Sequence, residues 1–147
     1  MCSCREKKTP EQAVKDLESA LGVRQYEPNL ADISVAKIES ITKLPIPSEA
    51  KILNLLNLHA LDDVFLVKFE LEMKRLDKFL ANTAFKRREN LSSKRNYCSN
   101  FEDISWWNIS KINTFLSGSY NRDDGKSNNI LIDLANPQKA VVYLQTY

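Results

Sequence analysis

The sequence predicts an α+β fold, a single domain with a mainly antiparallel sheet, two or three helices packed on one face, and a C-terminal β-hairpin. Two apolar, strand-like runs, residues 130–134 and 140–147, flank a turn at Asn136-Pro137, which is typical of a hairpin. Residues 64–71 alternate apolar and charged side chains, as a half-buried strand does. Helices are too few to connect every pair of strands, which favours antiparallel pairing.

Length and composition bound the function classes. The chain has 147 residues, of which 43% are hydrophobic and 27% are charged, and this fits one domain with a core of its own. We expect a flexible tether over residues 1–8 and the domain over residues 9–147. The net charge of +2 lacks the basic excess of a nucleic-acid-binding surface. With 3 glycines, 3 cysteines and 1 histidine, we predict no phosphate loop, no metal and no organic cofactor.

The N-terminal third is predicted to contain a helix and a strand. Thr9 and Pro10 are typical of a helix start, and Gly22 is typical of a helix end, so a helix is expected between them. The β-branched residues that follow predict a strand over residues 33–41. Two prolines in residues 44–47 then indicate an extended connector.

The middle of the chain is predicted to form a hairpin. Residues 51–58 fit either a helix that begins at Ser48 or a buried strand. We favour the strand, because it would pair with the strand over residues 64–71 across a turn at Asp62-Asp63.

Four features are expected between this hairpin and the C-terminal one. Residues 74–81 carry an apolar stripe at helical spacing, and residues 86–100 are polar and basic, which indicates an exposed loop. An irregular segment with Trp106 and Trp107 follows. Residues 120–126 are rich in Asn, Asp and Gly, which predicts a turn.

The tryptophan pair is the sharpest candidate for a binding site, because tryptophan is enriched at interaction hot spots and stacks on sugars and bases. The structural interpretation, which we favour, is that one Trp fills the core and the other covers its edge. If the pair does bind, we expect a surface that combines the Trp segment with the preceding basic loop. Its predicted residues are Trp106, Trp107, Phe101, Tyr120, Arg87 and Arg88.

Catalysis has less support, and no catalytic residue is predicted. A small hydrolase would need a cleft where His59, the single histidine, meets an acid such as Asp62 or Asp133. No G-x-S-x-G nucleophile motif occurs. The pairs Asp62-Asp63 and Asp123-Asp124 are better explained as turn residues, because Asp bonds its own backbone there.

The N-terminus has two interpretations. Ser3-Cys4 followed by a charged stretch is typical of a bacterial lipoprotein processing site, with the lipid on Cys4. No hydrophobic segment precedes it, so this interpretation requires a trimmed chain with a new Met1. In the alternative, the protein is cytosolic and Cys2 and Cys4 are reduced and unmodified. An odd number of cysteines argues against a closed disulfide framework.

Several segments together resemble small, uncharacterised bacterial envelope lipoproteins in their mature form, without a signal peptide. The resemblance implies a non-catalytic protein-binding accessory factor on the periplasmic side of the envelope, anchored by a lipid on Cys4, and more narrowly an immunity-type inhibitor of a toxin or effector. It implies a protein partner, no nucleic acid, and membrane contact only through the lipid. The alternatives are the small envelope hydrolase and a cytosolic regulatory module. The segments are Leu44-Pro-Ile-Pro-Ser-Glu-Ala-Lys51, Leu61-Asp-Asp-Val-Phe-Leu-Val-Lys-Phe69, Leu76-Asp-Lys-Phe-Leu80, Trp106-Trp107, Ile130-Leu-Ile-Asp133 and Val142-Tyr-Leu144.

Overall fold

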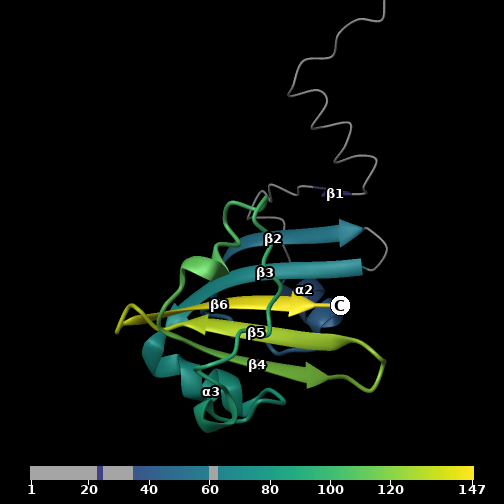
Figure 1. Ribbon diagram of the computed structural model, residues 1–147. Coiled ribbons are helices and arrows are strands. Elements are labelled where there is room, and N and C mark those ends of the chain that lie inside the picture. The colour runs from purple at the N-terminus through teal and green to yellow at the C-terminus, as the bar shows by residue number, and fades with distance from the viewer. Residues whose placement is uncertain (1–22, 25–34, 60–62) are drawn as a thin grey trace, which may run out of the picture.

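The computed structural model describes residues 23–24, 35–59 and 63–147, which form an α+β domain with one antiparallel sheet (Figure 1). The predicted fold class is confirmed. The strands are β1 (Val23–Arg24), β2 (Lys51–His59), β3 (Asp63–Glu72), β4 (Phe115–Asn121), β5 (Ser127–Asp133) and β6 (Lys139–Thr146). The α-helices are α2 (Val35–Thr42) and α3 (Leu76–Ala81), and short 3-10 turns lie at Met73–Arg75, Arg88–Asn90 and Ile109–Lys111.

The C-terminal hairpin lies in the middle of the sheet, whose strand order is β1-β2-β3-β6-β5-β4. Strand β6 pairs with β3 from Phe65↔Thr146 to Glu72↔Lys139, and with β5 from Asn128↔Thr146 to Asp133↔Val141. Central strands are buried on both faces, which explains why β6 reads as a nearly continuous apolar run. The predicted hairpins, β2–β3 and β5–β6, are both confirmed.

One face of the sheet packs against the two helices. Alternate residues of β3 point to this side and meet Ile38 of α2 and Phe79 of α3. The rings of Phe69 and Phe79 meet edge to face with centroids 5.6 Å apart. Each such buried side chain contributes roughly 1.5–3 kcal/mol through the apolar surface that it removes from water. Among the described residues, the buried cluster on the helical side is larger than the cluster on the opposite face.

The opposite face is covered by the irregular chain between α3 and β4, which crosses in front of the sheet in Figure 1. Cys98, Ile104 and Trp107 of this chain are buried against Leu66 and Tyr143 of the sheet. The prediction of an exposed loop over residues 86–100 is thus wrong at two positions, because Leu91 and Cys98 are only 8% and 6% exposed.

Two other predictions are corrected. The segment predicted as a strand over residues 33–41 contains helix α2, in which Ile38 and Thr42 lie one turn apart and are buried. Tertiary packing of that stripe outweighs the strand preference of the β-branched residues. The turn predicted at residues 120–126 begins later, because β4 continues to Asn121. The turn is closed by the N–H of Arg122, which donates to the carbonyl oxygen of Lys126 (2.7 Å), and Gly125 has a φ of 82°.

Other predictions are confirmed or lie outside the described part of the chain. Residues 51–58 form a strand, as favoured, and residues 74–81 are helical, with the first turn a 3-10 turn. The predicted helix between Thr9 and Gly22, the tether over residues 1–8 and position Asp62 lie outside the described residues.

The C-terminal end of α2 is held by side chains of the sheet. The Nδ2 of Asn128 donates to the carbonyl oxygen of Thr42 (2.7 Å), and the Nη1 of Arg122 donates to that of Ile41 (2.8 Å). These carbonyls have no partner within the helix, and a cation at this end interacts favourably with the helix dipole. Thr146 donates to Asn128 in turn (2.8 Å). A helix of 8 residues is too short to be stable alone, so these bonds fix its position.

Replacing Asn128 with Ala is expected to lower the free energy of unfolding by about 1–3 kcal/mol, because the carbonyl of Thr42 would be buried without a donor. Urea denaturation followed by circular dichroism measures the change. The matched control is Asn121→Ala, at an exposed position whose side chain bonds only Ser127, and its expected effect is within about 0.5 kcal/mol. Equal losses from the two variants would contradict the role given to Asn128.

Candidate functional site

Polar side chains of the sheet bind the backbone of residues 97–99, which lead into the segment that contains Trp106 and Trp107. The N–H of Tyr97 donates to the Oγ of Ser117 (2.9 Å), and its carbonyl accepts from the Nδ2 of Asn129 (2.9 Å). The N–H of Ser99 donates to the Oε1 of Gln145 (2.7 Å), whose Nε2 donates back to the Oγ of Ser99 (3.1 Å). Ser117, Asn129 and Gln145 are buried. They take the place of the ladder bonds that an irregular segment cannot make.

Trp107 is the anchor of this segment. Its side chain is 1% exposed, and its Nε1 donates to the carbonyl oxygen of Ser99 (2.9 Å). Its ring meets Tyr143 edge to face on one side (centroids 5.4 Å apart) and Trp106 on the other (5.8 Å). Trp106 is half-buried. This is the arrangement favoured from the sequence, in which one Trp fills the core and the other covers its edge.

Lys68 supports the backbone at Trp106 from the sheet. Its Nζ donates to the carbonyl oxygen of Trp106 (3.4 Å) and lies 5.1 Å from the centroid of the Tyr143 ring. Burial lowers the pKa of Lys68, and the carboxylate of Asp133 partly offsets this. Burial, with the same carboxylate adding to it, raises the pKa of Tyr143 to about 12, and its hydroxyl donates to the Oδ1 of Asn108 (3.1 Å). At neutral pH the contact is a cation over a neutral phenol.

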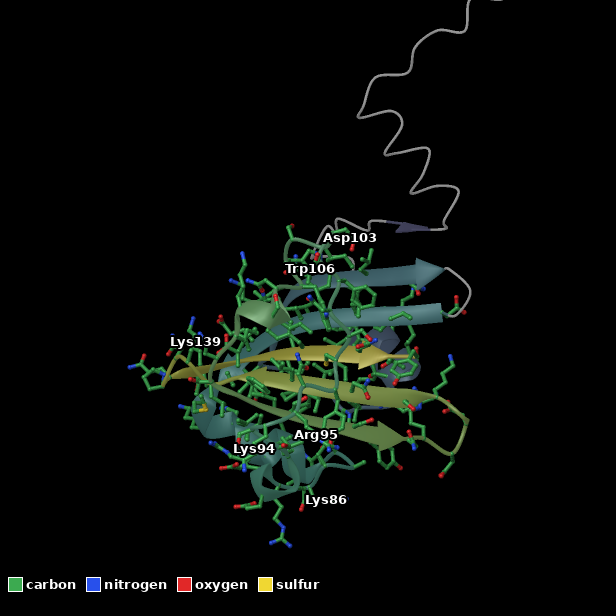
Figure 2. The ribbon with its side chains drawn as sticks, viewed as in Figure 1. Lys86, Lys94, Arg95, Asp103, Trp106 and Lys139 are labelled. Carbon is green, nitrogen blue, oxygen red and sulfur yellow. The ribbon has the colours of Figure 1, made fainter. Side chains whose placement is uncertain are left out.

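We call the irregular chain that covers the face of the sheet opposite the helices the front layer. An aromatic surface lies at the β2 end of this layer. Trp106 and Phe101 are both half-buried against the same core cluster, and Glu102 and Asp103 beside them are exposed. Figure 2 shows Trp106 and Asp103 close together above β2. We call these four residues the Trp106 surface.

The other predicted site residues lie elsewhere. Arg87 and Arg88 follow α3, and the Nε of Arg88 forms an ion pair with Asp77 of that helix (2.6 Å). In Figure 2 their neighbours Lys86 and Lys94 lie at the end of the molecule opposite Trp106. Tyr120, which is 39% exposed, lines a hollow of about 350 Å³ on the helical side. The six predicted residues therefore form three separate groups and not one surface, and the predicted lipid site Cys4 lies outside the described residues.

Of the residues proposed for a hydrolase, His59 and Asp133 lie at opposite ends of the sheet. His59 ends β2 and is in register with Asp63, whereas Asp133 ends β5 and is in register with Phe115 at the other end of the sheet. The length of β5 alone, from Ser127 to Asp133, separates the two ends by about 20 Å at 3.3 Å per residue. Asp62, the other candidate acid, lies outside the described residues. A site that joins His59 to Asp133 is therefore excluded.

Among residues 23–24, 35–59 and 63–147, no three His, Cys, Asp or Glu side chains come together as metal ligands. In the same part of the chain, no helix has the length and apolar character that crossing a bilayer requires. Compared with known proteins, the chain matches no family model, no curated protein and no solved structure. Evidence for function therefore comes from the arrangement of its own side chains.

Two groups buried where the front layer meets the sheet, the Cys98 thiol and the Tyr143 phenol, should make the folded protein less stable at alkaline pH. Burial raises the pKa of Cys98 from 9.0 to about 12, and Tyr143 rises from 10.0 to about 12. The unfolded chain loses these protons first, so stability is fully present below pH 9.0 and falls as pH rises toward 12. Urea denaturation at increasing pH measures the slope, which should be shallower in Cys98→Ala. An unchanged slope in that variant would show that Cys98 does not titrate in this way.

Proposed function

We propose that this protein is a non-catalytic protein-binding factor and that the Trp106 surface is its contact. The observation that carries the proposal is that neighbouring groups hold the half-exposed indole of Trp106 in place. The buried Trp107 packs against its ring, and the half-buried Lys68 bonds its backbone. A large aromatic side chain that is already held in place loses little entropy when it binds, and such residues dominate interface energies.

The composition of the surface agrees with a protein interface. Trp106 and Phe101 give an apolar centre, and the exposed Glu102 and Asp103 give an acidic rim. Interfaces commonly combine an aromatic centre with a polar rim, and charge complementarity selects the partner. A partner face with an apolar hollow and basic side chains around it fits this arrangement.

We also propose that the protein is located in the bacterial envelope. The Ser3-Cys4 sequence and the resemblance to small envelope lipoproteins support a periplasmic location with a lipid on Cys4. An immunity-type inhibitor of a toxin or effector is the most concrete form that this resemblance suggests. It rests on analogy between families and carries no residue roles.

Replacing Trp106 with Ala is expected to abolish partner capture, because loss of a hot-spot tryptophan costs about 2 kcal/mol or more of binding free energy. The measurement is affinity capture from source cells with mild crosslinking, followed by mass spectrometry. One dominant, stoichiometric protein should be captured by the native chain and lost in Trp106→Ala, while circular dichroism shows that the variant is still folded at the temperature of the assay.

Tyr120→Ala is the matched control for this experiment, because Tyr120 is an exposed aromatic residue outside the Trp106 surface. Capture should survive that change. If nothing reproducible is captured, or if Trp106→Ala captures the same protein equally well, the Trp106 surface is not a protein-binding site.

The lipid on Cys4 can be tested separately. We expect the protein from the membrane fraction of source cells to carry a lipid mass on Cys4, and Cys4→Ser to release it into the soluble fraction. Intact-mass spectrometry and fractionation measure both effects. An unmodified Cys4 in a soluble protein would contradict the envelope location and leave the Trp106 surface to be judged on its own test.

A further inference from the structure

A second charged surface lies at the α3 end of the molecule. Lys86, Arg87, Lys94 and Arg95 are all exposed, and none of them forms an ion pair with another described residue. In the view of Figure 2, Lys86, Lys94 and Arg95 all lie at the α3 end of the molecule. We call these four residues the basic loop surface. The sequence alone favoured a solvated loop here, and the structure shows how the loop is held.

The loop is anchored at both ends. Phe85 and Leu91 are buried in the helical core, and the Nδ2 of Asn90 donates to the carbonyl oxygen of Phe85 (2.6 Å). Ser92 then exchanges two backbone hydrogen bonds with Ser117 of β4 (2.8 and 2.9 Å). Basic side chains on a loop that is already ordered lose less entropy on binding than those on a free loop.

The start of the loop, directly after Phe85, has a strained backbone. Lys86 has a φ of 69°, and the N–H of Arg87 donates across it to the carbonyl oxygen of Phe85 (2.9 Å), which closes a γ-turn. Glycine would adopt this conformation without steric cost, but lysine does not. Strain of this kind is concentrated at functional sites. A lysine at this position places a cation at the tip of the turn.

The charges around the turn indicate the chemistry of a partner. The turn borders a hollow of about 560 Å³, which Lys86, Arg87 and Arg88 line together with two carboxylates. One carboxylate, Asp77, forms an ion pair with Arg88 (2.6 Å), and the other is the exposed Glu89. These carboxylates would repel the phosphate groups of a membrane or a nucleic acid. A protein that binds the basic side chains through acidic residues can also place a basic side chain of its own beside the carboxylates. We propose that the basic loop surface binds an acidic segment of a protein partner. This proposal does not depend on the Trp106 surface.

The test is a selection of random peptides displayed on phage against the full chain. Enriched peptides should be rich in Asp and Glu, and fluorescence anisotropy should show that added salt weakens their binding. The double variant Lys94→Glu/Arg95→Glu should weaken binding roughly tenfold or more, because it replaces attraction by repulsion. The matched control, Lys37→Glu/Lys126→Glu, changes the net charge equally at exposed positions elsewhere and should bind normally.

A second variant changes the loop position and leaves every charge in place. A Cβ at Gly118 would lie 2.6 Å from the Cδ2 of Leu91 and 3.2 Å from the Phe85 ring, so Gly118→Ala requires these two side chains, which anchor the loop, to shift. We expect it to weaken peptide binding severalfold while the protein still unfolds cooperatively. Trp106→Ala should bind the same peptides normally, which separates this proposal from the function proposed above.

Three results would overturn the proposal. The first is a selection that enriches no acidic peptides. The second is acidic peptides that bind the Lys94→Glu/Arg95→Glu variant as tightly as the native chain. The third is tighter binding to phosphatidylglycerol vesicles or to duplex DNA than to the peptides, lost in the same variant, which would assign the surface to phosphate groups.

Discussion

Backbone groups that cross the face of a sheet need hydrogen-bond partners, and in this protein side chains of the sheet provide them. Gln145, Asn129 and Ser117 come from three adjacent strands and bond the backbone at Tyr97 and Ser99. Each of the three would be costly to bury alone, because an unpaired buried amide or hydroxyl loses its bonds to water. The pairing satisfies both partners and allows a chain with little regular structure to act as a layer of the domain.

The central position of β6 makes this arrangement possible. Gln145 points to the front layer, and its neighbour Thr146 points to the helical side, where it bonds Asn128 and so supports the end of α2. Successive residues of a strand face opposite sides of a sheet, so one short segment holds both layers. Changes near the C-terminus should therefore affect the helices and the Trp segment together.

The two proposed surfaces are carried by the same irregular chain between α3 and β4, whose first part packs on the helical core through Phe85 and Leu91. The basic loop surface lies near its beginning, where Ser92 bonds β4, and the Trp106 surface lies further along, above β2. Between them the chain is fixed at Tyr97 and Ser99, and Trp107 fixes it again directly after the Trp106 surface. Neither surface lies on a strand or helix, yet both are ordered by bonds to the sheet. Binding residues often lie on loops that a stable scaffold positions.

The sequence by itself determined the strands of the two hairpins, helix α3 and the α+β class, because alternation and turn residues act over short distances. It did not determine α2, where Ile38 and Thr42 become a buried stripe only when the sheet is present. It also could not show that Trp107 is buried while Trp106 is half-exposed, or that Arg87 and Trp106 lie far apart. Those outcomes depend on contacts such as Gln145 with Ser99, which are distant in sequence and leave no local pattern.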